Sequence, residues 1–355
     1  MLLAFLALLQ DTVRVTHASC ATCRIILTAT DSLLNTEFEG EAAYRGWHPL
    51  SDGRVLLVDF NGRALPALVS RDRATLRSLS RRGDGPGELT NARAGRVLPG
   101  DTLLILDRTH RRLELYDANG RWARGFATQR PYDAIRLSNG GFLVSGPSAS
   151  PRWAGRSLFV YDADGTPRGM WPEPKGPVLP WHPWLQQRVL ATVGGEIWAA
   201  YPMGYPIIEI RDGRTGAVQR VLYREAAWLP AIDPTIPLPD HRTPTIPDAQ
   251  LIALLPRDSL VWVIWRAVSP KWRRGVSTSR SERGAEQWMV TKPDLAFDTY
   301  VEAYSQRTGA LLASRQIDDQ ILLANAQGGF VRERTSPSED DWLVSYQFTL
   351  STSRR

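Results

Sequence analysis

The chain has few of the residues from which catalytic and metal sites are usually built. It holds 2 Cys and 5 His among 355 residues. The histidines stand singly, without the i, i+4 or His-x-His spacing that a metal cage needs. There is no Gly-x-Ser-x-Gly elbow and no phosphate-binding loop. These absences exclude the common histidine-based metal centres, the serine hydrolases with that elbow and the P-loop enzymes.

Lysines and long hydrophobic runs are also scarce. Only Lys175, Lys271 and Lys292 are present, and although the net charge is +6, the arginines alternate with acidic residues. Without a basic block that follows phosphates, we expect no nucleic-acid partner. The apolar run at 1–9 is too short to span a bilayer and fits a secretory signal, so we expect a leader over 1–19, no transmembrane segment and an extracytoplasmic location. No positive charge precedes the run, which leaves a buried N-terminus as the alternative.

The two cysteines stand just after this leader, as Cys20-Ala-Thr-Cys23. In an exported chain, such a pair most often forms a short disulfide loop, which is the interpretation we favour. A lipid anchor on Cys20 is an alternative, because two small residues precede it as in a lipobox. A redox site or half of a zinc site are further alternatives, but no second Cys or His pair completes a zinc site.

A repeated unit is the strongest pattern in the sequence. Residues 112–120 and 157–165 share an alternating apolar strand, a Tyr-Asp pair and a turn that ends in glycine. Such a unit cannot bury its apolar face alone, so its repetition predicts stacking against copies of itself. Turns rich in Gly, Asn or Asp precede further apolar strands, which we place at 53–59, 102–107, 141–145, 196–200, 259–265 and 329–332.

These six hairpins predict an all-β fold, a six-bladed β-propeller with four-stranded antiparallel blades. The last unit, 321–350, is one strand short, and the apolar strand at 24–29 has no local partner. Pairing the two supplies the missing edge and closes the propeller, which removes its open sheet edges. We therefore treat 20–355 as one domain and expect a monomer. Three insertions interrupt the repeat, at 171–185, 228–247 and 271–298.

One glycine-rich octet resembles a family signature. Residues 82–89 resemble the Gly-x-Gly-Pro-Gly-Glu-Phe motif of exported bacterial six-bladed β-propellers related to the NHL-repeat group. Leu89 stands where that motif has Phe, and the matching positions are Gly83, Gly85, Pro86, Gly87 and Glu88. The paired cysteines also resemble the family's N-terminal arrangement. The resemblance implies fold and export but no activity, because one fold serves many functions.

The same octet has two physical interpretations. Its backbone N–H groups are able to cradle an anion. The interpretation that we favour is a stiff turn between blades, in which Glu88 bonds to nearby backbone.

Asp59 and Asp107 end equivalent strands of successive units, so we expect them on one face around the propeller axis. Carboxylates there are suited to hold Ca²⁺. Such a site would be similar to those of the calcium-dependent lactonases and metal-bearing lyases built on six-bladed propellers. We favour the alternative that both aspartates accept hydrogen bonds from turn N–H groups.

Large aromatic residues gather in two of the insertions. The candidates for ligand contact there are Trp171, Trp181, His182, Trp184 and Trp228. Loop-borne Trp beside Pro either packs down as a lid, which we favour, or forms an apolar platform for a sugar or peptide. Trp198 and Trp262 lie on predicted strands, and we assign them to the core.

We expect a secreted or envelope-associated scaffold that binds a protein, peptide or glycan, with no catalytic residue and no cofactor. The alternative is a metal-dependent propeller enzyme of the lactonase or lyase type, with an axial divalent cation such as calcium.

Overall fold

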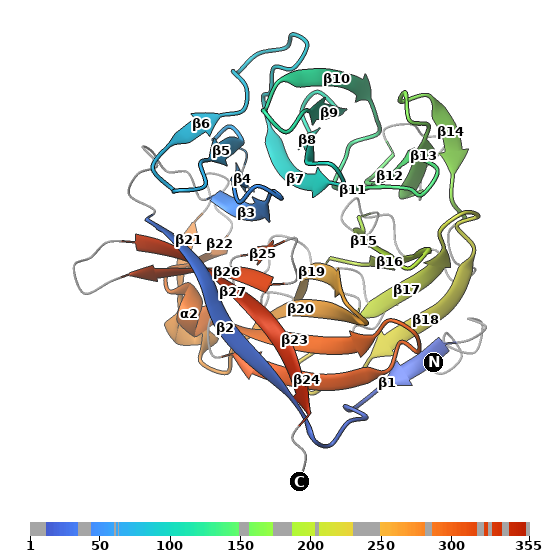
Figure 1. Cartoon of the computed structure of the whole chain (residues 1–355). Coiled ribbons are helices and arrows are strands. Elements are labelled where there is room, and N and C mark those ends of the chain that lie inside the picture. Colours follow the sequence, from blue (N-terminus) through green and yellow to red (C-terminus); the bar gives the residue numbers. More distant parts are fainter. Residues whose placement is uncertain are drawn as a thin grey trace.

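The fold is a β-propeller of antiparallel blades, seen nearly along its axis in Figure 1. The computed structural model describes residues 12–34, 44–59, 62, 64–148, 156–172, 187–202, 206–229, 249–280, 286–317, 323–325, 329–335 and 341–352. The strands expected from the turn signals are all present, within a few residues at their ends.

Three blades are plain four-stranded sheets. The first contains β7 (Ala92–Leu98), β8 (Thr102–Asp107), β9 (Arg112–Tyr116) and β10 (Trp122–Ala127). The second contains β11 (Asp133–Arg136), β12 (Phe142–Ser145), β13 (Leu158–Tyr161) and β14 (Pro167–Met170). The third contains β19 (Gln250–Arg257), β20 (Leu260–Val268), β23 (Phe297–Ser305) and β24 (Leu311–Ile317).

Two blades are larger. One contains β15 (Val189–Val193), β16 (Glu196–Ala200), β17 (Ile207–Asp212) and β18 (Val218–Arg224), with β1 (Thr12–Val15) added in parallel at its outer edge. The other runs in the order β2 (Cys23–Leu34), β27 (Asp341–Thr352), β26 (Gly329–Thr335), β25 (Leu323–Asn325), β3 (Tyr44–Pro49), β4 (Val55–Asp59), β5 (Ala67–Val69) and β6 (Leu76–Ser78).

The predicted number of blades was wrong. The described residues form five sheets of four or more strands rather than six. The reason is a parallel pairing of β25 with β3 at Asn325 and Trp47, which merges the segments expected to form the first and last blades into one eight-stranded sheet. A single pair of residues joins the two halves, and a pairing between strands so far apart in the sequence leaves no signal in the local turn pattern.

The inner strands gather about a common centre, where Figure 1 shows β7, β11, β15 and β19 together with β25 and β3. Apolar clusters lie between successive blades and cover the faces of their inner strands. All five residues of β4 are buried, and so are the residues of β8 from Leu103 onward. Trp198 and Trp262 are 0% and 1% exposed, which confirms their assignment to the core.

The strand expected at 24–29 pairs with the last strand of the chain, as predicted. β2 runs antiparallel to β27 along almost its whole length, with Ile25 opposite Leu350. The structure also shows a strand that the sequence reading missed. Residues 12–15, which were assigned to the leader 1–19, form β1 beside β18, so the folded part of the chain includes Thr12. Residues 1–11 lie outside the described part.

The two cysteines form a disulfide, which confirms the favoured interpretation. Cys20 and Cys23 are bonded to each other, with their Cα atoms 5.4 Å apart. Both side chains pack with the apolar core between β2 and the β19–β24 blade. The sulfur of Cys20 is taken up by this bond and has no thiol left for a lipid.

Most of the third insertion is described, and it leaves the propeller between β20 and β23. It contains a 3-10 turn at Trp272–Arg274, a hairpin of β21 (Val276–Arg280) and β22 (Glu286–Val290), and the single turn α2 (Pro293–Ala296). No described helix has the length and apolar character needed to cross a bilayer.

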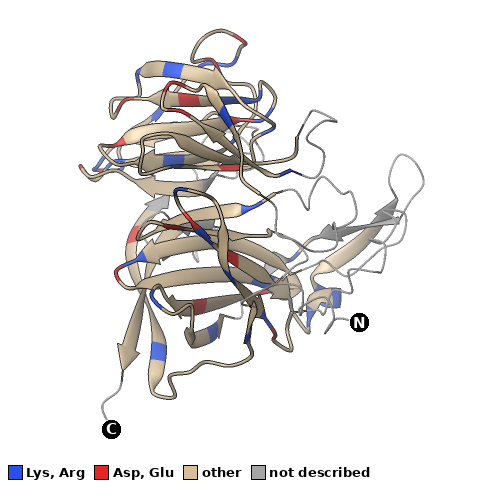
Figure 2. Cartoon of the chain, turned by 90° about the vertical axis from the view of Figure 1, so that its right-hand side faces the viewer, with Lys and Arg blue, Asp and Glu red and all other residues tan. Residues whose placement is uncertain are grey.

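Basic and acidic residues are interspersed along the described strands and turns in Figure 2. Several of them are paired within one blade, such as Arg54 with Asp52 at 2.7 Å and Arg220 with Glu196 at 3.6 Å.

The pairing of β2 with β27 can be tested with two neighbouring residues of one strand. Ile25 is 5% exposed and Ile26 is 45% exposed. We predict that Ile25→Ala lowers the free energy of unfolding by about 2–4 kcal/mol, because it leaves a cavity. Ile26→Ala is the matched control and should cost less than about 1 kcal/mol. Urea denaturation measures both, and equal losses would contradict the register.

Candidate functional site

The glycine-rich octet links β6 to β7, and its own glutamate bonds to its backbone. The carboxylate of Glu88 accepts a hydrogen bond from Gly85 N at 2.9 Å and one from Arg81 Nε at 2.6 Å. These bonds lower the pKa of Glu88, with the Gly85 bond as the larger cause. A carboxylate of the loop thus takes the position that a bound anion would need. This geometry agrees with the favoured interpretation of a stiff turn between blades.

Gly87 fixes this loop against the β7–β10 blade. Its φ is 73°, and a Cβ placed there would lie 2.6 Å from Cγ of Trp122. Its carbonyl oxygen accepts hydrogen bonds from Tyr116 Oη at 2.9 Å and from Ser80 Oγ. Only glycine combines this left-handed conformation with such a close approach of an indole ring.

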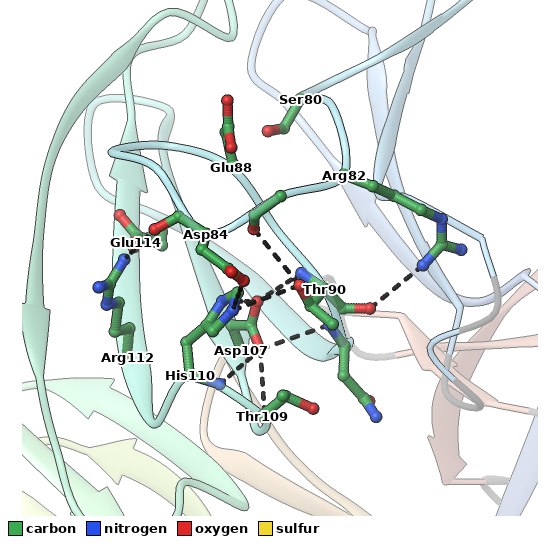
Figure 3. A network of polar contacts seen from close by, with 12 residues as sticks. Ser80, Arg82, Asp84, Glu88, Thr90, Asp107, Thr109, His110, Arg112 and Glu114 are labelled. Carbon is green, nitrogen blue, oxygen red and sulfur yellow. Dashed lines mark hydrogen bonds and ion pairs between the residues drawn. The ribbon is translucent and has the colours of Figure 1, made fainter.

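A histidine connects the octet to the β8–β9 turn, as Figure 3 shows. His110 Nε2 lies 2.7 Å from Oδ1 of Asp84, and His110 Nδ1 lies 3.1 Å from Oδ2 of Asp107. Thr90 Oγ1 lies 3.3 Å from the same Nε2 atom. Asp84 is exposed and Asp107 is fully buried, so His110 links a carboxylate at the surface to one inside the blade.

The two aspartates considered as calcium ligands in the alternative interpretation end β4 and β8 and accept backbone hydrogen bonds from the segments that follow or adjoin them. Asp107 accepts bonds from the N–H groups of Thr90 at 2.7 Å and Thr109 at 3.0 Å. Asp59 accepts one from Ala64 N at 2.9 Å. Both carboxylates are 0% exposed. Within the described ranges, no three His, Cys, Asp or Glu side chains come together as a metal would require. A calcium site at these residues stays the untested alternative.

The three insertions leave from the same face of the propeller, which we call the insertion face. In a four-stranded blade, the second and fourth strands end where the first begins, and the inner strands of successive blades run the same way. The insertions follow β14, β18 and β20, which are fourth, fourth and second strands. Asp107, at the end of β8, lies at this face too. Sequence spacing located the insertions but not this shared side.

Trp171 is part of the core rather than an exposed platform. It is 5% exposed and packs with Leu158 and Ile197 between two blades. A Cβ on Gly216, in the β17–β18 turn of the next blade, would lie 2.2 Å from its Cγ atom. Trp181, His182 and Trp184 lie outside the described residues.

Trp228 forms an aromatic stack at the insertion face. Its ring lies parallel to that of Tyr300, with an interplanar angle of 7° and centroids 3.9 Å apart, and both residues are partly exposed. The buried Trp265, which is 2% exposed, contacts the ring of Trp228 edge-on, and the two ring centroids are 6.2 Å apart. Tyr300 was not among the predicted residues, because its position opposite Trp228 depends on the packing of two blades.

A buried ion pair supports this stack. Arg224 on β18 contacts Glu302 on β23 at 2.8 Å, so the pair joins two blades. Burial raises the pKa of Glu302, and that rise is opposed by Arg224 and by hydrogen bonds from Tyr304 Oη and Trp265 Nε1. The Arg224 guanidinium also lies 5.7 Å from the centroid of Trp228.

A second ion pair lies among the inner strands. Arg96 on β7 donates to Asp133 on β11 at 2.6 Å and to Leu190 O on β15 at 2.8 Å. Three blades meet at this arginine. Beside it, burial first and the charge of Arg96 second lower the pKa of His48 to about 3. Nδ1 of His48 is out of reach of water and has no hydrogen-bond partner among the described residues. A charged residue in a short apolar inner strand is the signal that could have identified Arg96.

Comparison with known proteins shows what fold the chain shares with them. No family model matches the chain, and no curated protein matches it. A protein from Bacteroides fragilis NCTC 9343, named as a candidate exported protein, has a TM-score of 0.61 at 10% identity over 96% of this chain and 100% of that chain. A member of the DUF4221 family from Bacteroides vulgatus ATCC 8482 has a TM-score of 0.55 at 12% identity over 93% and 99%. These likenesses show that the chain shares the fold of both proteins.

The octet can be tested at Gly87, with Gly100 as the matched control. Both have positive φ, 73° and 77°, but a Cβ on Gly100 would meet nothing within 4 Å. We predict that Gly100→Ala costs about 1 kcal/mol of unfolding free energy, from backbone strain alone. Gly87→Ala should cost roughly 1–3 kcal/mol more, because Trp122 must move. Equal losses in chemical denaturation would show that Trp122 does not confine the loop.

His48 predicts a pH dependence of stability. Because its folded pKa of about 3 lies below the unfolded value of 6.5, the unfolded chain takes up the proton first as the pH falls. The stability contribution is therefore complete above pH 6.5 and is lost progressively toward pH 3. Between pH 7 and pH 5 the loss should be about 2 kcal/mol.

The measurement is urea denaturation at both pH values, for the wild type and two variants. His48→Asn should remove this part of the pH dependence. His17→Asn, at an exposed residue, should retain it. The same pH dependence in His48→Asn and the wild type would contradict the assignment.

Proposed function

We propose that this chain is an extracytoplasmic β-propeller that binds a protein, peptide or glycan ligand on its insertion face. The observation that carries the proposal is that all three insertions leave the propeller from this one face. Loops on a rigid scaffold are the usual place for binding residues, because they vary without cost to the core.

The Trp228–Tyr300 stack supports the position of the site. The two rings stack at 3.9 Å and are held from below by Trp265, while both keep part of their surface exposed. Flat, rigid aromatic surface loses little side-chain entropy on binding and suits the apolar face of a sugar ring or a peptide side chain. Ligand contact at Trp228 is the role that we propose for this stack.

The extracytoplasmic location rests on two features of the N-terminal region. The apolar run at 1–9 fits a secretory signal, and the disulfide between Cys20 and Cys23 fits an oxidising compartment. The resemblance of residues 82–89 to the motif of exported propellers agrees with both. We also infer that the β2–β27 pairing closes the propeller, which would hold the insertion face rigid.

The proposal is tested by screening the purified chain on glycan and peptide arrays. We predict at least one ligand class that binds saturably, and a loss of about tenfold or more in affinity for Trp228→Ala, as expected for an aromatic contact of central importance. Trp122→Ala is the control, because Trp122 is 43% exposed and begins an outer strand at the opposite face. The absence of any ligand, or equal losses in both variants, would contradict the proposal.

The effect of calcium on the melting temperature distinguishes the binding scaffold from the alternative, a metal-dependent enzyme. If the chain were the metal-dependent enzyme, with Asp59 and Asp107 as ligands, calcium should raise its melting temperature in a saturable way, because a ligand of the folded state stabilises it. The binding scaffold predicts no such response. A saturable shift that Asp107→Asn abolishes would favour the enzyme.

A further inference from the structure

Three arginines lie at the insertion face near the junction of the β7–β10 and β11–β14 blades, and their charges interact. Arg93 is the second residue of β7, and Arg108 directly follows the end of β8, where its N–H donates to Asn91 O at 3.1 Å. Both therefore leave the same end of one hairpin. Arg130 comes from the segment before β11 in the next blade, and it is exposed. Its charge and that of Arg93 both act on Arg108.

A tyrosine lies beside these arginines. Tyr132 directly precedes β11, and its N–H donates to Ser145 O at 2.7 Å. The charges of Arg108 and of Arg266 on β20 both reach its phenol. Burial raises the pKa of Tyr132, so its hydroxyl keeps the proton and can donate a hydrogen bond at any physiological pH.

Within the described residues, no carboxylate neutralises the positive charge of this arginine cluster (Arg93, Arg108 and Arg130). Over the described ranges, none of the three is in an ion pair with a carboxylate, and Nε of Arg108 is buried without a hydrogen-bond acceptor. Nε of Arg93 donates to the amide oxygen of Asn91 at 2.7 Å, which carries no charge. Asp133, the carboxylate nearest to Tyr132 in sequence, is bound to Arg96.

Arg108 lies in an unfavourable electrostatic environment. Burial, then the charge of Arg130 and then that of Arg93 lower its pKa, and among the described residues only Tyr132, not a carboxylate, opposes this. Bringing like charges together out of water is unfavourable unless an opposite charge joins them. Two arginines that are buried more deeply have such a partner, Arg211 in Glu209 at 2.6 Å and Arg224 in Glu302, whereas the partly buried Arg108 has none among the described residues.

We propose that Arg93, Arg108 and Arg130, with the hydroxyl of Tyr132, form a binding site for an oxyanion, the carboxylate or phosphate group of a ligand held on the insertion face. The guanidinium groups and the phenol all donate hydrogen bonds, and arginine is well suited to carboxylate and phosphate oxygens. This inference builds on the proposed function, because it assigns a charge to the ligand, and it can fail while binding at Trp228 holds.

The test measures the affinity of the full chain for inorganic phosphate and, separately, for succinate, by isothermal titration at constant ionic strength set with chloride. We expect saturable binding of at least one of them. Arg108→Met should weaken it by about tenfold or more, as expected for a lost hydrogen bond between charged groups. Arg130→Met is the second variant, because this exposed residue can be changed without a buried cavity, and it should weaken binding in the same direction.

Arg121→Met is the matched control. Arg121 is exposed in the β9–β10 turn, at the face opposite the insertions, so its removal changes the net charge equally but leaves the cluster intact. The affinity of Arg121→Met for phosphate or succinate should equal that of the wild type. Phosphate binding without succinate binding would assign a phosphate group, and the reverse would assign a carboxylate. No binding above the chloride reference, or equal losses in Arg108→Met and Arg121→Met, would overturn the oxyanion site, whereas only the array screen decides the wider proposal.

Discussion

The structure depends on one constraint, which is that every blade buries both of its faces against its neighbours. A four-stranded sheet exposed on one side would leave an apolar face in water, and burial of apolar area is the main stabilising term in folding. In β8, Leu103 to Leu106 alternate between the two faces of the sheet, and all four are at most 1% exposed. This packing fixes each blade relative to the next, so the strand ends that carry the insertions have defined positions.

Polar groups between the blades set the finer arrangement. Arg96 joins the inner strands β7, β11 and β15 through Asp133 and Leu190 O, and Arg224 joins β18 to Glu302 on β23. Buried pairs of this kind add little net stability, because removing the charges from water costs about as much as their attraction returns. Their geometry is specific, however, and a shift between two blades would leave a charge unpaired. The Trp228–Tyr300 stack lies beside the second of these pairs, because Arg224 lies over the ring of Trp228.

The sequence predicted much of the fold and less of the candidate site. Turn residues with positive φ and alternating apolar strands are local signals, and they located the hairpins, the core tryptophans and the strand pairing at the termini. The disulfide was likewise favoured, because the two cysteines follow a run that fits a secretory signal. Trp171 was a candidate for ligand contact, but the packing against Gly216 of the next blade makes it part of the core. Tyr300, Arg96 and Arg108 were missed, because the partners that make them informative come from other blades.

What the sequence determined by itself is the all-β class, the repeating four-stranded unit and the places where insertions interrupt it, because each of these rests on contacts within a few tens of residues. Tertiary structure alone decided the rest. It merged β25 and β3 into one sheet, placed the three insertions on a single face, stacked Tyr300 on Trp228, and brought Arg93 and Arg108 beside Arg130. Each of these outcomes depends on how whole blades pack about the axis, and packing between distant segments leaves no periodic pattern in the chain.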